Sequence, residues 1–374
     1  MKGNIEYKII NEKITYEYAP EYDFGDYLES DDNIKAIFFD SICEGQRTKV
    51  FGYLGIPKNH NGNLPAVVLV HGGGGTAFDD WAKLWVDKGY VALAIDTEGH
   101  VPVKGNHMDY QDHADSPYFG RPNSRFQDTV EDINHTWMHY ATSSVMAAAE
   151  LLKSLECVDS NKVGVCGISW GGCITMITTC YYDKFAFSIP IYIALKIKGS
   201  GCRTEESYNT ECADIWESAP ITSVKTPMLY IGDIYDVCTS IHALSACAED
   251  VGGAYTSFQV GFGHGHDVGS IRKECFAFAD YICKGGKEPV AFIGRPDFEN
   301  KCVKFDSRGN DIQKVAIHYC EEYRSIDAKT WHEAPAVIEN GYIKADKNIN
   351  CATFYFEVVD ENGLIFTSYS SFKK

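Results

Sequence analysis

The sequence predicts an α/β fold, a mostly parallel sheet with helices on both faces, followed by a small C-terminal all-β module that is sandwich-like. In the first part, short and uniformly apolar runs such as "AVVLV" at 66–70 alternate with helix-like segments. Strands that are apolar on both sides belong to sheets that helices cover on both faces. After about residue 286 the pattern changes to short alternating runs separated by turn residues, which is typical of antiparallel strands.

The expected elements of the first part follow one another as this fold requires. Residues 34–56 contain two β-like runs on either side of "CEGQR", which predicts a hairpin. The segment "AFDDWAKLWVDKG" has apolar residues at helical spacing and a stop at Gly89, which predicts a helix. Further buried strands are expected in "LPAVVLV", "YVALAID", "KVGVCGI", "AFSIPIYI" and "PMLYIGD", and further helices in "INHTWMHYATSSVMAAAELLKSL" and "SIRKECFAFADYICKGG".

The change of pattern near residue 286 predicts two domains. Residues 1–286 are expected to form the α/β domain with an N-terminal arm, and residues 287–374 the β module. The strands of the module are expected in "KVAIHYC", "GYIKAD" and "CATFYFEVVD". The sequence leaves three roles open for this module, namely sugar binding, dimerisation and coverage of the α/β domain.

Composition and charge indicate a globular protein without a polyanionic partner. The 52 acidic residues outnumber the 34 basic ones, and a formal net charge of −18 disfavours binding to nucleic acid or to an acidic membrane surface. No stretch approaches the ~18 apolar residues of a membrane-spanning helix, and the polar start "MKGNIEYKIINEKITYEY" does not read as a secretion signal. The 14 cysteines are scattered without a C-x-x-C pair, which argues against a zinc site and indicates reduced cysteines in the cytoplasm.

The motif "VGVCGISWGG" at 163–172 carries the strongest chemical signal. It places Ser169 between Gly167 and Gly171, directly after a strand-like run and before a helix-like run. A nucleophile elbow requires this arrangement, because the turn holds the serine at strained backbone angles and leaves no room for flanking side chains. The sequence therefore predicts that Ser169 is a catalytic nucleophile.

Two later loops contain candidates for the other members of a catalytic triad, a histidine that takes the serine proton and a carboxylate that orients the histidine. The acid is expected after the strand in "TPMLYIGDIYDVCTS", where Asp236 is preferred over Asp233 because it lies further past the strand. The base is expected after the strand in "YTSFQVGFGHGHDVG", where His264 is preferred over His266 because it comes first and has glycine neighbours. Asp233 as the acid and His266 as the base stay open as alternatives.

Donors for the negative charge of a tetrahedral intermediate are expected at two places. The backbone N–H of Trp170 directly follows the nucleophile, and in "HGGGG" at 71–75 the glycines, Gly73 and Gly74 among them, let the backbone approach the acyl carbon. The same loop lacks the Lys-Ser/Thr pair of a phosphate-binding loop, which favours an oxyanion hole. His71 at the head of the loop is interpreted as a structural residue.

These residues resemble a known family. The stretches "VVLVHGGGGTAFDDWAKLWVDKGYVALAID", "AAAELLKSLECVDSNKVGVCGISWGG" and "GFGHGHDVGSIRKECFAFAD" are similar to the dienelactone hydrolase and acetyl xylan esterase-like branch of the α/β hydrolases, over about residues 35–285. The resemblance implies Ser169 as nucleophile, Asp236 as acid, His264 as base and the glycine loop as oxyanion hole. Members of the branch include deacetylases of sugars and of antibiotics.

Two long connections are expected to shape the substrate pocket. Residues 97–131 and 196–218 follow strands whose carboxyl ends should border the active site, and long loops in compact domains are often functional. Aromatic residues that could stack on a sugar are Phe78, Tyr118 and Trp216. No metal or other cofactor is expected, because a serine mechanism needs none.

The sequence therefore predicts a serine esterase that removes small acyl groups, acetate first of all, from a carbohydrate or a similar polar alcohol. Its partner is a small-molecule ester such as an acylated sugar, and the sequence is compatible with a homo-oligomer. A prolyl-oligopeptidase-like serine peptidase is one alternative, but the roughly 60 residues before "HGGGG" are too few for the propeller that such enzymes usually carry. A non-catalytic binding protein on the same fold is the other, and the intact Ser, Asp and His candidates argue against it.

Overall fold

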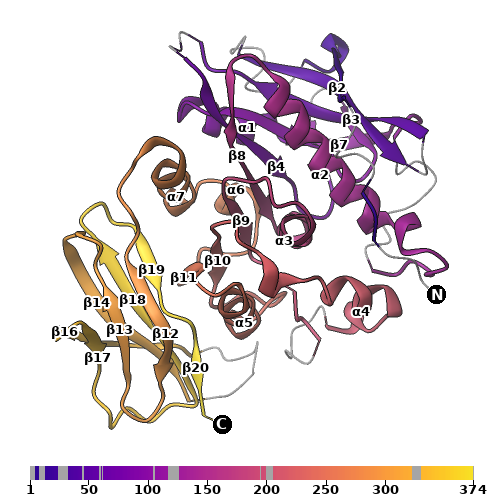
Figure 1. The fold of residues 1–374 in the computed structure, drawn as a ribbon. Coiled ribbons are helices and arrows are strands. Elements are labelled where there is room, and N and C mark those ends of the chain that lie inside the picture. The colour runs from indigo at the N-terminus through magenta and orange to yellow at the C-terminus, as the bar shows by residue number, and fades with distance from the viewer. Residues whose placement is uncertain are drawn as a thin grey trace. The chain divides into compact units, whose positions relative to one another are not determined.

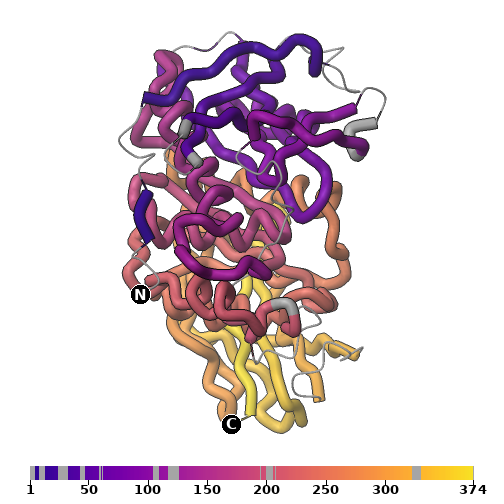
Figure 2. The backbone as a smooth tube through the Cα atoms, turned by 90° about the vertical axis from the view of Figure 1, so that its right-hand side faces the viewer, coloured from indigo at the N-terminus to yellow at the C-terminus, as the bar shows by residue number. Residues whose placement is uncertain are grey.

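The computed structural model describes residues 5–7, 13–23, 33–43, 46–58, 60, 62–103, 106–116, 126–193, 195–198, 205–321 and 330–373 (Figure 1). The chain divides into two compact units, of which the first contains Met1–Ser188 and Asn209–Pro220 and the second contains Ile189–Tyr208 and Ile221–Lys374. Figure 2 shows the path of the backbone, with the residues outside the described ranges in grey. Within those ranges, no helix has the length and apolar character needed to cross a membrane.

The first unit is built on a sheet in which antiparallel strands at one edge join three parallel strands. The strand order is β1 (Tyr16–Tyr18), β2 (Ile34–Cys43), β3 (Gln46–Gly55), β5 (Val91–Ile95), β4 (Leu64–Val70) and β8 (Val158–Ile168). β2 and β3 pair along their whole length and confirm the hairpin predicted over 34–56. β4 runs parallel to both β5 and β8, and every residue of β5 is buried, as expected for a strand covered on both faces.

Helices pack on this sheet where the apolar periodicity predicts them. They are α1 (Asp79–Asp87), α2 (Trp137–Ser154) and α3 (Trp170–Tyr181). The unit also contains α4 (Glu211–Glu217) and a short 3-10 turn at Ile133–His135. α1 lies against β5 and β3, while α2 lies against β8 and β2 and packs beside α3 (Figure 1). α2 is buried along most of its length, which explains why its sequence is apolar on nearly every side.

Both long connections contain regular structure that the sequence did not predict. Within 97–131, β6 (His100–Val103) and β7 (Asn106–Asp112) pair as an antiparallel hairpin. Within 196–218, a 3-10 turn at Glu205–Tyr208 precedes α4 along the chain. β7 is exposed from Asp109 to Asp112, so it lacks the apolar alternation by which a strand is recognised in a sequence.

The second unit contains three parallel strands and the C-terminal β module. The parallel strands are β9 (Ser188–Ile191), β10 (Leu229–Asp233) and β11 (Tyr255–Gln259), in this order. α5 (Ile241–Val251) lies against β10 and β11, and α6 (His266–Gly269) and α7 (Lys273–Lys284) follow β11 along the chain. Because Asp233 pairs with Gln259, β10 and β11 end side by side, and the loops with the acid and base candidates start from adjacent strand ends.

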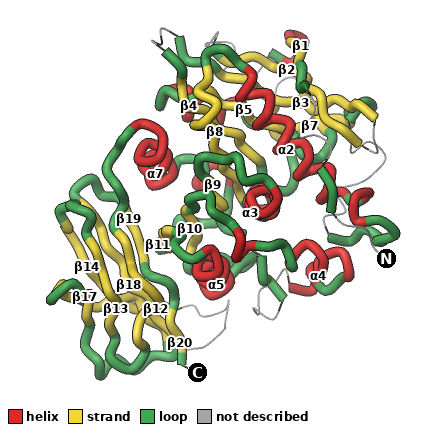
Figure 3. Tube along the Cα trace, viewed as in Figure 1, coloured by secondary structure: helices red, strands yellow, loops and turns green. Residues whose placement is uncertain are grey.

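From Ala291 onward the chain forms two antiparallel sheets, which confirms the sandwich-like module (Figures 1 and 3). One sheet has the order β12 (Ala291–Asp297), β13 (Cys302–Asp306), β17 (Tyr342–Lys344) and β16 (Val337–Glu339). The other has the order β15 (His332–Pro335), β14 (Ile312–Cys320), β18 (Thr353–Asp360) and β19 (Ile365–Thr367), with β20 (Ser371–Phe372) also paired to β18. On β18, the ring of Phe354 lies 5.6 Å from that of Phe298 and the ring of Tyr355 lies 6.1 Å from that of Phe258 on β11. Neighbouring residues of β18 thus pack on opposite faces, and both faces are buried.

β19 joins the module to β11 inside the second unit. The side-chain hydroxyls of Thr256 and Ser257 on β11 donate hydrogen bonds of 2.6 Å to main-chain carbonyl oxygens of β19. The module therefore belongs to the same compact unit as β10 and β11. The division of the chain into residues 1–286 and 287–374 stays a prediction.

We expect Glu357→Gln to destabilise the module most strongly near neutral pH. Glu357 is buried on β18, and its carboxylate lies 3.2 Å from Nε2 of His318 and 3.2 Å from Nζ of Lys314. Burial alone would raise the pKa of this carboxyl, but the two partners hold the pKa of Glu357 below its ordinary value. The folded protein therefore binds this proton more weakly than the unfolded chain. The carboxylate stabilises the fold above the unfolded pKa, and this stabilisation is lost as the pH falls through the lowered pKa.

At neutral pH the Glu357→Gln substitution should lower the free energy of unfolding by about 1–3 kcal/mol. Urea unfolding of both proteins at neutral pH and at about pH 3 measures the effect, and the difference should shrink in acid. An equal difference at both pH values would contradict the role assigned to the ionised carboxylate.

Candidate active site

Ser169 lies at the turn between β8 and α3, in the first unit. Its backbone has φ 55° and ψ −120°, a conformation that residues with a side chain rarely adopt. Such strain persists only where the surroundings enforce it, and strained residues cluster at functional positions. The buried strand, the strained serine and the following helix are the parts that a nucleophile elbow requires.

The two glycines that flank this turn are required by close backbone approach. A Cβ atom on Gly167 would lie 2.2 Å from the carbonyl oxygen of Gly171 and 2.2 Å from Oγ1 of Thr175. A Cβ atom on Gly171 would lie 2.1 Å from the carbonyl oxygen of Val70 and 2.4 Å from that of His71. The glycines of G-x-S-x-G therefore let the start of α3 approach β8 and the end of β4.

We expect Gly171→Ala to destabilise the first unit by about 3 kcal/mol, because the new methyl group would overlap main-chain oxygens that cannot move without displacing β4. The matched control is Gly62→Ala, where nothing lies within 4 Å of the added Cβ. The control should cost only about 1 kcal/mol, from its positive φ. Urea unfolding of the three proteins measures both effects, and similar losses in the two variants would contradict the overlap.

The glycine loop that follows β4 is held beside Ser169. A Cβ atom on Gly72 would lie 3.2 Å from Cβ of Ser169, so the loop passes close to the serine. His71 is buried, its Nε2 accepts a hydrogen bond of 3.0 Å from the N–H of Thr97, and its Nδ1 lies 2.6 Å from the carbonyl oxygen of Gly72. The Thr97 contact leaves Nε2 as the acceptor and the proton on Nδ1. These contacts are the ones expected if His71 holds the loop, and its structural role stays a prediction.

The predicted oxyanion donors differ in their surroundings. The N–H of Gly74 donates a hydrogen bond of 3.1 Å to Oε1 of Glu98, a buried residue. The prediction that Gly74 stabilises an oxyanion is therefore wrong for this conformation, because a carboxylate already accepts its N–H. The donors at Gly73 and Trp170 stay predictions. Trp170 is the first residue of α3, where main-chain N–H groups have no acceptor within the helix.

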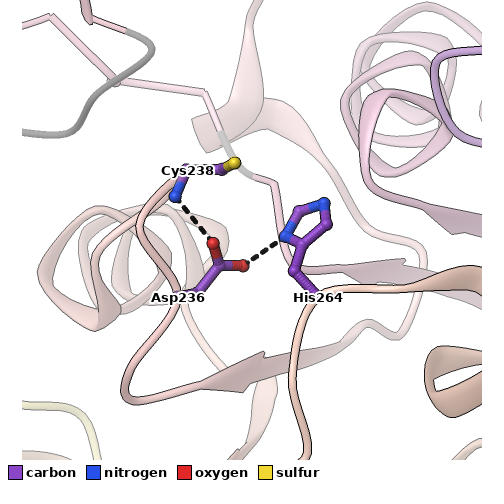
Figure 4. Close-up of side chains that lie close together, drawn as sticks. All are labelled: Asp236, Cys238 and His264. Atoms are coloured by element: carbon purple, nitrogen blue, oxygen red, sulfur yellow. Dashed lines mark hydrogen bonds and ion pairs between the residues drawn. The ribbon is translucent and has the colours of Figure 1, made fainter.

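Asp236 and His264 form a hydrogen-bonded pair in the second unit (Figure 4). Nδ1 of His264 lies 2.7 Å from Oδ2 of Asp236, and the other carboxylate oxygen accepts a hydrogen bond of 2.7 Å from the N–H of Cys238. The Asp236 side chain is only 1% exposed, while that of His264 is 25% exposed. Because an ionised carboxylate can only accept, Nδ1 carries a proton, and in the neutral imidazole Nε2 then carries the lone pair. This tautomer is the one that a general base needs.

Asp233 has a different role from Asp236. One of its carboxylate oxygens accepts hydrogen bonds of 2.8 Å from the N–H of Tyr235 and 3.2 Å from that of Gly261. The other accepts one of 2.6 Å from the N–H of Gly263. Asp233 thus fixes the main chain of both loops, directly before His264. The structure brings His264 together with Asp236, the pair that the sequence preferred, and His266 is the first residue of α6.

Tyr192 is a residue of this site that the sequence did not predict. Its ring stacks on the imidazole of His264 with 4.4 Å between centroids, and its hydroxyl donates a hydrogen bond of 3.2 Å to the carbonyl oxygen of Gly265. Its φ of 72° is strained, and burial raises the pKa of its phenol, so the hydroxyl stays a donor at neutral pH. The available signal was a tyrosine at the end of an apolar strand, which by itself indicates only burial.

The predicted sugar-stacking residues do not form an exposed surface. Trp216 is fully buried in α4 beside Tyr181, and Phe78 is buried against Gly75 of the glycine loop. The substrate-binding prediction is therefore wrong for Phe78 and Trp216, because other side chains already cover the ring faces on which a sugar would stack. Tyr118 lies outside the described residues.

Comparison with known families gives one family match. The family model described as acetyl xylan esterase (AXE1) matches residues 10–195. A comparison with curated proteins finds no match. The matched range includes Ser169 and the glycine loop at 71–75.

Several solved structures are similar in fold. An acetyl xylan esterase from Paenibacillus sp. R4 has a TM-score of 0.53 and 17% identity, covering 73% of this chain and 91% of that chain. Acetyl Xylan Esterase 1 from Thermoanaerobacterium sp. JW/SL YS485 has a TM-score of 0.50 and 16% identity, covering 70% and 85%. An acylaminoacyl peptidase from Pyrococcus horikoshii has a TM-score of 0.51 and 17% identity, covering 70% of this chain but only 44% of that chain.

The structural similarity confirms the predicted α/β-hydrolase fold, and the family match agrees with the resemblance read from the sequence. The chain therefore has the α/β-hydrolase fold, and over residues 10–195 it is similar to the acetyl xylan esterase family.

Proposed function

We propose that the protein hydrolyses small acyl esters, acetyl esters above all, of a carbohydrate or a similar polar alcohol, with Ser169, His264 and Asp236 as its catalytic triad. The observation that carries the proposal is the His264–Asp236 hydrogen bond of 2.7 Å, which leaves Nε2 as a base. The strained elbow at Ser169 supplies the matching nucleophile. The three residues follow one another in the order Ser, Asp, His, which is the order of the α/β-hydrolase triad.

In the proposed mechanism, Oγ of Ser169 attacks the ester carbonyl carbon while Nε2 of His264 takes its proton. The carboxylate of Asp236 stabilises the imidazolium that forms, and the N–H groups of Gly73 and Trp170 stabilise the oxyanion. The imidazolium then gives its proton to the departing alcohol. Water, activated by the same imidazole, releases the acid from the acyl-enzyme. The mechanism requires Nε2 to reach Oγ during the reaction.

The choice of substrate rests on the family. The matching family model is described as acetyl xylan esterase, which supports an acetyl group on a sugar. The negative net charge of −18 supports an uncharged ester over a polyanion. We also place the protein in the cytoplasm, because the cysteines of the described residues are free of disulfides.

A substrate panel combined with active-site labelling tests the proposal. The purified protein should hydrolyse p-nitrophenyl acetate faster than longer acyl esters and should release acetate from acetylated sugars. A fluorophosphonate probe should label Ser169, as located by peptide mass spectrometry. Preferential cleavage of prolyl peptides would favour a peptidase instead. Failure of the probe to label the folded protein would favour the alternative of a non-catalytic binding protein.

A further inference from the structure

A thiol lies beside the acid and base of the second unit. Asp236, Cys238 and His264 each offer one metal-ligand atom, and these atoms all lie within 4.8 Å of one another. In Figure 4 the thiol of Cys238 projects toward the His264 ring. In the part of the chain that the structure describes, no other group of three or more His, Cys, Asp or Glu side chains comes as close.

We propose that Asp236, Cys238 and His264 form an inhibitory site for a thiophilic divalent cation, Zn²⁺ or Cd²⁺. A thiolate, an imidazole nitrogen and a carboxylate oxygen are the ligands that Zn²⁺ prefers, and three protein ligands leave a fourth position for water. Cys238 is half-buried and outside any disulfide, and the His264 side chain is 25% exposed, so an ion can reach both. The inhibitory part of this inference rests on the proposed triad, while the binding part does not.

The cluster needs only small movements to close around an ion. Ligand bonds of about 2.0 Å to nitrogen and oxygen and about 2.3 Å to sulfur place tetrahedral ligands roughly 3–4 Å apart. The Nδ1 to Oδ2 distance of 2.7 Å must therefore open slightly, and the thiol must move inward. The N–H of Cys238 already donates a hydrogen bond to Asp236, which keeps the main chain of Cys238 beside the other two ligands. The stacked Tyr192 ring keeps the imidazole plane in place.

Binding of the ion would switch off the base. The cation takes the position of the proton between Nδ1 and Oδ2, and that proton moves to Nε2 of the neutral imidazole. The Cys238 thiol releases one proton to solvent as it becomes a thiolate, so charge and protons balance. Nε2 then carries a hydrogen and has no lone pair with which to accept the Ser169 proton. The bound ion thus blocks the first step of the proposed reaction.

Titration with each ion, with Cys238→Ser and a matched Cys302→Ser control, tests this inference. Cys302 is likewise half-buried but lies on β13. Cd²⁺ should produce a thiolate-to-metal ultraviolet absorbance that disappears in Cys238→Ser and persists in Cys302→Ser. Zn²⁺ should inhibit ester hydrolysis, measured against each protein's own metal-free rate. The half-inhibitory concentration should rise about tenfold or more in Cys238→Ser only.

The two readouts separate failure of this inference from failure of the proposed function. Equal Cd²⁺ absorbance in the wild type and Cys238→Ser would overturn the site, whatever the enzyme activity. Cd²⁺ absorbance that depends on Cys238 without any Zn²⁺ inhibition would overturn the inhibitory role. If the wild type hydrolyses no ester, the proposed function fails, and the absorbance alone decides whether the cation site exists.

Discussion

Ser169→Ala should abolish ester hydrolysis, with a fall in kcat of about 10⁴-fold or more. The hydroxyl oxygen is the atom that forms the acyl-enzyme in the proposed mechanism. KM should change much less, because the oxyanion donors and the pocket stay in place. Initial rates with p-nitrophenyl acetate at saturating and at low concentration measure both parameters.

The fold should tolerate this substitution. Alanine has the same backbone preferences as serine at the strained φ of 55°, so the unfolding midpoint should stay close to that of the wild type. Ser218→Ala, at an exposed serine after α4, is the control and should keep full turnover. Turnover in Ser169→Ala at the rate of this control would exclude Ser169 as the nucleophile.

His264→Ala should lower kcat by about 10³-fold or more, while His266→Ala should keep turnover close to the wild type. The difference follows from Asp236, whose carboxylate bonds Nδ1 of His264 and so leaves Nε2 as the acceptor. His266 instead begins α6, two residues further along the loop. Single-turnover acylation with p-nitrophenyl acetate reports on the proton-transfer step directly.

The opposite ranking of the two variants would assign the base to His266. Equal and large losses in both would point to collapse of the loop, which circular dichroism and the unfolding midpoint of each variant would reveal. Asp233 fixes this loop through the N–H groups of Gly261 and Gly263, so a collapsed loop should also appear in Asp233→Ala. A loss confined to His264→Ala supports the proposed base.

Much of the fold could be predicted because its signals are local. The hairpin over 34–56, α1 and the buried strands follow from the period of apolar residues over a few neighbours. The elbow could be predicted for a similar reason, because Gly167, Ser169 and Gly171 lie at alternate positions of one short segment and this spacing meets the steric requirement of the turn. The hairpin of β6 and β7 was missed because exposed polar strands carry no such period.

Other features depend on residues that are distant in sequence or indistinguishable by pattern. The carboxylate of Glu98, 24 positions further along the chain, accepts the N–H of Gly74, so this N–H is not available as an oxyanion donor. Trp216 and Phe78 are aromatic residues of the kind that stack on sugars, yet the side chains of both are buried in the fold. Tyr192, directly after β9, stacks on the His264 ring although 72 positions separate them, and no sequence pattern predicts that contact.

The amino-acid sequence by itself determined the α/β architecture, the serine turn and the two loops that hold the acid and base, since each depends on residues within a few positions of one another. Tertiary structure alone decided that Asp236 bonds His264 while Asp233 binds main-chain N–H groups. Asp233 is the last residue of β10 and Asp236 lies three positions later, and both side chains have the same chemistry. Their roles differ because the Asp236 carboxylate bonds an imidazole and the Asp233 carboxylate bonds main-chain N–H groups. Among these partners, His264, Gly261 and Gly263 lie after β11, which pairs with β10.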